Sequence, residues 1–171
     1  MNMSVLTILL SFIVAAVNPQ QPSFLDTFRQ KVEQECVYVE YEYVATVSGV
    51  KTKGDGQIHV QSNAYRMNGN GLEIYCDGES TWVIDEAAGE VMIESATSKD
   101  AGYLANPVLL LVNIEKTALS YESMGNNVTV ELDGVRLQIT VKKMETSDMK
   151  KTEDFRPPYE FDADWIVTDL R

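Results

Sequence analysis

Few side chains in this 171-residue sequence could carry out acid–base, nucleophilic or metal chemistry. There is one histidine, His59, and there are two cysteines, Cys36 and Cys76. A Ser-His-Asp or Cys-His arrangement would have to be built on His59, and no nucleophile-elbow motif accompanies it. Zinc and similar metals need several His or Cys ligands close together, which the sequence does not offer. We expect no catalytic residues, no metal site and no cofactor.

Carboxylates are abundant, but their pattern favours a solvated surface. Glu40 and Glu42 could form a glycosidase-like pair. Residues two apart on a strand share one face, and in a chain with net charge −12 such a pair is far more typical of the solvent side. The glycines of this region predict turns and make no phosphate-binding loop: Gly49, Gly54, Gly56, Gly69 and Gly71. We therefore do not expect an enzyme.

The acidity also limits the partners of the protein. Nucleic acid is excluded as a natural partner, because phosphate binding needs clustered Lys and Arg. An anionic membrane surface should also repel the chain. In an oxidising compartment Cys36 and Cys76 could pair, but two free buried thiols fit the sequence equally well.

The N-terminal segment predicts export. Val5 to Val17 is uncharged and apolar, yet too short to cross a hydrocarbon core of roughly 30 Å as a helix. Small residues Ala15 and Ala16 precede a polar stretch, as in a cleaved signal peptide over residues 1–18. The alternative is a short buried N-terminal helix. We expect residues 19–171 to form a single domain, and a monomer.

The elements that would position any site are mostly strands. From Val37 to Ser48, apolar residues alternate with polar ones over a dozen positions, which predicts one long strand. Shorter alternating segments follow, joined by the hairpin dipeptides Asp77-Gly78 and Asp133-Gly134 and by a turn at Ala88-Gly89. A last short strand is expected near Trp165 to Thr168.

Two helices accompany these strands. Ser23 to Glu35 has apolar residues at helical spacing, with Ser23 as N-cap. Asn106-Pro107 opens an apolar run that ends at Val112 and predicts a short helix. We therefore expect a mainly β (α+β) protein, with a strongly curved antiparallel sheet or open half-barrel. The N-terminal helix and the short apolar lid helix would lie over a hydrophobic cavity.

A one-layer sheet with so little helical cover predicts a cavity that a ligand fills. The residues expected to line this cavity are the apolar side chains of the strands: Val39, Tyr41, Tyr43, Ile58, Val60, Tyr65, Met67, Leu72, Ile74, Trp82 and Ile84. The residues expected in the lid are Pro107, Val108, Leu109, Leu110 and Val112. Plain core packing is the alternative for each of these positions.

The order of these segments resembles the periplasmic outer-membrane lipoprotein carriers, the LolA-like family, in a divergent Bacteroidetes-type form. The likeness is carried by the strand Ala64 to Met67, the strand–turn–strand Leu72 to Asp85, the apolar run Asn106 to Leu111 and the closing strand Phe161 to Leu170. Family members often have a basic residue and a proline before the aromatic strand, where this chain has Gln61 to Asn63.

The resemblance implies a periplasmic chaperone that shields the acyl chains of lipoproteins and ferries them toward the outer membrane. Its partners would be acylated lipoproteins or lipids, an inner-membrane release complex and an outer-membrane acceptor. The alternative on the same scaffold is a regulatory domain that senses lipid or lipoprotein without transport.

Overall fold

The described part of the chain forms one ten-stranded sheet. The computed structural model describes residues 23–96, 110–111, 114 and 118–171. The strands are β1 (Cys36–Val47), β2 (Val50–Gln61), β3 (Ala64–Gly69), β4 (Leu72–Cys76), β5 (Ser80–Asp85), β6 (Glu90–Ser95), β7 (Ser120–Met124), β8 (Asn127–Leu132), β9 (Val135–Ser147) and β10 (Ile166–Asp169). Their spatial order is β10-β6-β5-β4-β3-β2-β1-β9-β8-β7. This confirms the mainly β, curved antiparallel architecture.

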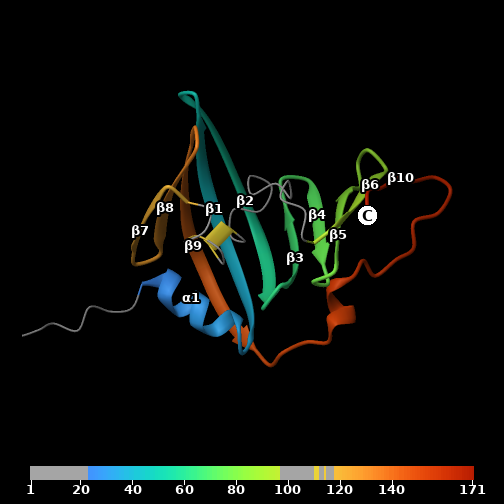
Figure 1. Ribbon diagram of the computed structural model, residues 1–171, viewed down its shortest axis with the longest axis horizontal. Helices are drawn as coiled ribbons and strands as arrows, with labels where there is room; N and C mark the ends of the chain where they lie inside the picture. The colour runs from blue at the N-terminus through green and yellow to red at the C-terminus, as the bar shows by residue number, and fades with distance from the viewer. Residues whose placement is uncertain (1–22, 97–109, 112–113, 115–117) are drawn as a thin grey trace, which may run out of the picture.

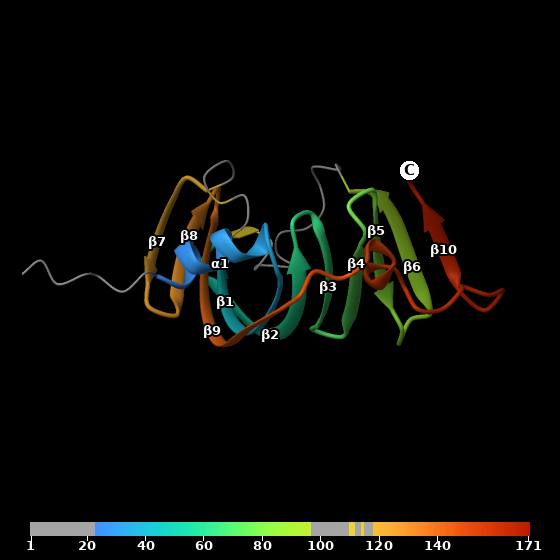
Figure 2. The same ribbon diagram turned by 90° about the horizontal axis from the view of Figure 1, so that it is seen from below.

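The sheet is an open arc, with β7 at one edge and β10 at the other (Figures 1 and 2). Neighbouring strands are antiparallel except β10, which runs parallel to β6. The longest strands, β1, β2 and β9, form the centre of the arc. The register between β1 and β9 shifts between Glu40 and Tyr41, and such an irregularity bends the strand that carries it.

Helix α1 (Phe24–Val32) covers one face of this arc, here called the inner face. It begins at Ser23, whose hydroxyl accepts from the Asp26 backbone N–H in a capping box, as the sequence predicted. Its apolar side buries Phe24, Leu25 and Phe28 against the sheet. Both ends are tied to turns, since Phe24 N–H donates to Gly125 O and Ser62 N–H donates to Val32 O.

The opposite, outer face is crossed by residues 148–165, which connect β9 to β10 and are here called the crossing segment. It contains the short helix η1 (Thr152–Phe155), and Phe155 is fully buried against Cys36 and Ala64. Beyond it, Tyr159, Phe161 and Trp165 form a cluster of rings at centroid distances of 5.4–6.2 Å. Residues 148–164 showed no strand or helix pattern in the sequence, and their structural role was not predicted.

Two polar contacts fix the crossing segment to the sheet. The buried Gln61 side chain donates to Lys150 O at 2.8 Å and accepts from Lys150 N–H at 2.7 Å. The Arg156 guanidinium contacts the buried Asp77 carboxylate at 2.7 Å. Gln61 lies in the segment where members of the similar family often have a basic residue. In this structure its side chain anchors the crossing segment.

Gly54 and Gly56 correct a sequence prediction, because they lie inside β2 and not in turns. The rings of Tyr43 and Tyr41 lie directly over them. A Cβ added at Gly54 would come within 2.6 Å of the Tyr43 ring, and one at Gly56 within 2.7 Å of the Tyr41 hydroxyl. Gly69 likewise ends β3, whereas Gly49 and Gly71 lie in turns as predicted.

Other sequence predictions are confirmed with small shifts in their bounds. The long first strand and the closing strand were both predicted, and the dipeptides Asp77-Gly78 and Asp133-Gly134 do join strands. Edge strand β7 was not predicted, because its exposed residues hardly alternate. The signal-peptide prediction lies outside the described residues. Within the described ranges, no helix is long and apolar enough to cross a bilayer.

Replacing Gly56 by Ala should destabilise the protein by about 1–3 kcal/mol, because the buried Tyr41 ring leaves no room for a Cβ. The measurement is the free energy of unfolding in urea at pH 7. The exposed Thr52 of the same strand serves as control, and T52A should stay within about 0.5 kcal/mol of the wild type. Equal stability of G56A and the wild type would refute the close ring contact.

Candidate functional site

The inner face carries a continuous apolar surface from strand to strand. Val39 pairs with Ile58, Ile58 with Met67, and Met67 with Ile74. Directly paired residues of neighbouring strands point to the same side of a sheet. All four side chains are buried in one cluster with α1. The row is therefore a single hydrophobic surface built by four strands.

Most of the predicted cavity residues belong to this cluster. The members that the sequence identified are Val39, Tyr41, Tyr43, Ile58, Val60, Tyr65, Met67 and Ile74. Leu72 shares their face, because it pairs with Gly69 two residues from Ile74, and it is half-buried at the start of β4. The structure therefore brings these side chains together on the inner face.

Trp82 and Ile84 are a correction, because they point to the outer face. Trp82 pairs with Tyr75, whereas the inner-face residue Ile74 pairs with Val83. Both side chains belong to a separate cluster with Val91 and Ile93 under the crossing segment. Residues 82–84 are apolar at every position, so their alternation could not show which face is inner. Val83 takes the inner position that the sequence analysis gave to its neighbours.

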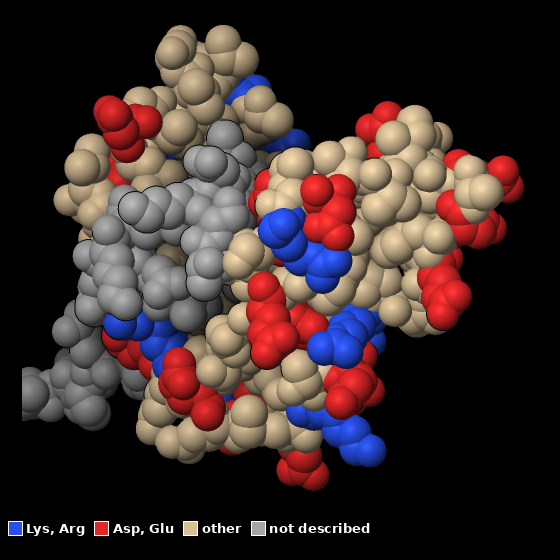
Figure 3. Space-filling view, turned by 45° about the vertical axis from the view of Figure 1, so that its right-hand side comes forward, with Lys and Arg blue, Asp and Glu red and all other residues tan. Residues whose placement is uncertain are grey.

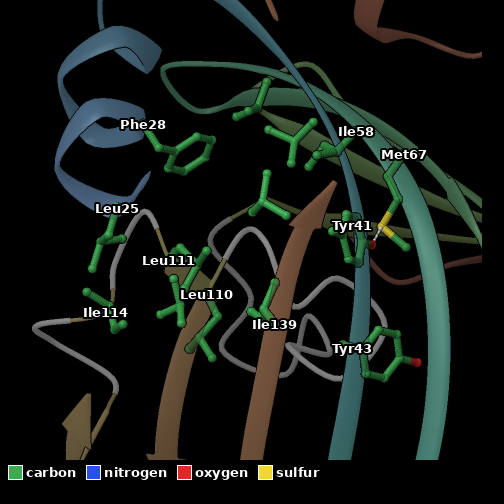
Figure 4. Packing of buried hydrophobic residues seen from close by; sticks show 14 of the residues in the cluster. Leu25, Phe28, Tyr41, Tyr43, Ile58, Met67, Leu110, Leu111, Ile114 and Ile139 are labelled. Atoms are coloured by element: carbon green, nitrogen blue, oxygen red, sulfur yellow. Dashed lines mark hydrogen bonds between the residues drawn. The ribbon is translucent and has the colours of Figure 1, made fainter. Parts of the chain in front are cut away.

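Most of the predicted lid lies outside the described residues, namely Pro107, Val108, Leu109 and Val112. Leu110 is the lid residue that the structure describes. Leu110 is fully buried in the inner cluster. Leu111, which belongs to the same predicted helical run but was not assigned to the lid, and Ile114, beyond that run, are equally buried there. Figure 4 shows the three side chains between Leu25 of α1 and Ile139 of β9. This segment therefore covers part of the inner face beside α1.

The few polar groups within the inner cluster are phenols with weak or local partners. Within the described residues, the hydrogen-bond partner of the Tyr41 hydroxyl is the Met67 sulfur, at 3.8 Å (Figure 4). The Tyr43 hydroxyl accepts from Asn70 Nδ2 at 2.7 Å. Burial raises the pKa of Tyr41 and Tyr65 far above that of a free phenol, so both stay neutral. The surface therefore offers area and little directional bonding.

His59 and Cys36 line one outer-face pocket of about 430 Å³, so a Cys-His pair had to be considered. Burial raises the pKa of the Cys36 thiol. Burial, assisted by the nearby Arg66 and Lys150 charges, lowers the pKa of His59. Both shifts oppose the thiolate–imidazolium pair that a nucleophilic cysteine needs. His59 instead packs against Tyr38, with ring centroids 4.8 Å apart and ring planes tilted by 45°.

The paired carboxylates also have structural partners. Glu40 accepts from the Tyr38 hydroxyl at 2.7 Å, and Glu42 contacts Lys142 at 2.8 Å. Both line a polar outer-face pocket of about 730 Å³. Cys36 and Cys76 are free and buried. Across the described ranges, no group of three His, Cys, Asp or Glu side chains is arranged to hold a metal ion.

Comparison with known proteins supports the fold. No protein-family model and no curated protein matches the sequence. Among solved structures, a LolA superfamily protein from Nitrosomonas europaea is similar, with a TM-score of 0.53 over 80% of this chain and 97% of that chain. The two sequences are 11% identical. The likeness therefore extends to the fold, a single open and strongly curved sheet.

The buried phenols predict a particular loss of stability in alkali. The folded pKa of Tyr41 lies above the unfolded value of about 10, so its contribution is complete below pH 10 and is lost as pH rises toward the folded pKa. Y41F should cost less than about 1 kcal/mol at pH 7. It should also make the fall in unfolding free energy above pH 10 shallower. The exposed Tyr121 supplies the control Y121F, which should not change that fall.

Proposed function

We propose that this protein is a periplasmic carrier that shields the acyl chains of lipoproteins between its curved sheet and its helical cover. The carrier ferries this cargo toward the outer membrane and performs no chemical step on it. The observation that supports the proposal is the apolar inner face, which spans β8 to β4 and is covered by α1 and by Leu110, Leu111 and Ile114. Helical segments can move from a sheet without breaking its strand pairing.

The energies fit reversible shielding. One buried C16 chain is worth on the order of 12 kcal/mol at about 0.8 kcal/mol per methylene, so a triacylated protein does not leave a membrane unaided. A carrier must match most of this energy and still release the chains. Aliphatic, aromatic and methionine side chains such as Ile58, Tyr41 and Met67 supply area without a fixed bonding pattern.

Further elements of the proposal follow from the sequence. Residues 1–18 act as a cleaved signal peptide, and the mature protein acts as a monomer. An inner-membrane complex releases the cargo to it, and an outer-membrane acceptor removes that cargo. The net charge of −12 keeps the carrier from adhering to the anionic membranes that it visits.

The test is extraction of a triacylated lipoprotein. The protein from residue 19 onward is incubated with membranes that contain the lipoprotein, and a soluble equimolar complex is sought in the supernatant by native mass spectrometry. L110D should abolish the complex, because its carboxylate would lie in the acyl site. L119D adds the same charge at a site that is 76% exposed, and should retain the complex.

A second variant keeps the test decisive if L110D does not fold. Val83 is only half-buried on the inner face, so V83E should fold and still prevent extraction. A wild-type protein that extracts no lipoprotein would overturn the carrier proposal. Binding of lipoprotein without transfer to acceptor membranes would favour the sensing alternative.

The position of the acyl chains can be checked by fluorescence. Both tryptophans of the chain, Trp82 and Trp165, belong to the outer cluster. A brominated fatty acid bound at the inner face should therefore leave tryptophan emission nearly unchanged. In the V83W/W82F/W165F variant the same ligand should quench the emission strongly. Strong quenching in the wild type instead would place the acyl chains on the outer face.

A further inference from the structure

A further pocket lies on the outer face beneath the crossing segment, next to the pocket that His59 and Cys36 line. Its volume is about 390 Å³, and three cationic side chains line it: Arg66 from β3, and Lys150 and Arg156 from the crossing segment. The chain as a whole holds 26 acidic and 14 basic residues. Figure 3 shows acidic and basic side chains interspersed on the visible face, with several basic ones near its middle and lower right. Three cationic side chains around one pocket are therefore unexpected in a chain with so many more acidic than basic residues.

The three cations are held in place by neighbouring structure. Arg66 lies between His59 and Tyr75 in the strand register and is half-buried. The backbone of Lys150 is fixed by its two hydrogen bonds with Gln61. Arg156 uses its Nε to contact Asp77 at 2.7 Å. The backbone positions of Arg66 and Lys150 are therefore fixed by β3 and by the anchored crossing segment, and the Arg156 side chain is held by its Nε.

These cations have few anionic partners within the described part of the chain. No described carboxylate lies within ion-pair distance of Arg66 or Lys150, and Arg156 is paired only with Asp77. Glu153 and Asp154 also line the pocket. The Asp154 carboxylate accepts from the Lys151 backbone N–H at 3.2 Å. Both acidic residues are exposed, so solvent screens their charges more than it screens the charge of the half-buried Arg66.

Arg66 and Lys150 both lie near enough to His59 to act on its imidazole. After burial, the charges of Arg66 and Lys150 are the causes that lower the pKa of His59. His59 lines the adjoining pocket, which also includes Lys150. The positive field therefore extends from the floor of β3 to the crossing segment. An anion bound there would gain from Arg66 and Lys150 together, without displacing an existing carboxylate from either.

We propose that this pocket, defined by Arg66, Lys150 and Arg156, binds a phosphate monoester. The planar guanidinium groups suit bidentate contact with phosphate oxygens, and the lysine adds a point charge. The Tyr75 ring and the pair Pro157-Pro158 form the uncharged walls, against which a small organic group can lie. This site is separate from the acyl site, so either proposal can fail without the other.

The single histidine gives a direct test. The imidazole proton signals of His59 are followed by NMR as pH and ligand concentration change, with glycerol 3-phosphate as ligand and sodium chloride at equal ionic strength as control. Phosphate bound beside Arg66 and Lys150 should raise the pKa of His59 and shift its signals saturably. Sodium chloride should produce a much smaller, non-saturating change.

Three variants identify the pocket. R66Q and K150Q should each weaken glycerol 3-phosphate binding about tenfold or more, since a charge-assisted hydrogen bond is lost. K51Q removes the same charge from the exposed β1–β2 hairpin and should leave the affinity unchanged. Each variant is checked for folding by its tryptophan emission, which reports on the outer cluster. An equal loss in K51Q would overturn the proposal, because only general charge screening would then be at work.

The source of the phosphate is tested in parallel. Inorganic phosphate, glycerol 3-phosphate and vesicles of phosphatidic acid in phosphatidylcholine are compared as ligands. A response to the soluble ligands supports a free phosphate ester. A response to the vesicles alone supports the same chemistry presented by a lipid head group. No saturable His59 shift with any of the three would overturn the site.

Discussion

The structure depends on one constraint: a single sheet has two faces, and each apolar side chain on either face needs a cover. The inner face is apolar from β8 to β4, and α1 with Leu110, Leu111 and Ile114 lies over it. Strands β4 to β6 are apolar on their outer face as well. The described residues form no second sheet there, and the crossing segment supplies Phe161 and Trp165 as the outer cover. The position of every helix and of the crossing segment follows from this need.

The same constraint explains what could be predicted from sequence. Where one face is apolar and the other polar, as in Val37 to Val47, alternation gives both the strand and its inner side chains. Where both faces are buried, the pattern becomes continuous and the inner side cannot be identified. This is why Trp82 and Ile84 were assigned to the wrong face. Gly54 and Gly56 were taken for turn residues because the rings that cover them belong to another strand.

The position of the crossing segment could not be predicted from the sequence, for a different reason. It has almost no regular structure, and its anchors are single long-range contacts, from Gln61 to Lys150 and from Asp77 to Arg156. Neither contact leaves a periodic signal in the sequence. They nevertheless determine the surface chemistry of the outer face, because they bring the cations of the crossing segment beside Arg66. The two faces of the sheet thus differ in kind: one is apolar and covered by helices, and the other combines an aromatic cluster with a cationic pocket.

The parallel pairing of β10 with β6 has a consequence for the order of folding. All other strand pairs join antiparallel neighbours, and most of these are linked by short turns, so they can form early and locally. The pairing of β10 closes a long stretch of chain that includes β7 to β9. The β1–β9 pairing closes a still longer stretch, from Val47 to Val135, so the outer aromatic cluster is expected to assemble only after the local hairpins. Until that step Trp82 and Ile84 are exposed to solvent. A folding intermediate of this protein therefore exposes an aggregation-prone apolar surface on the outer face of β4 to β6.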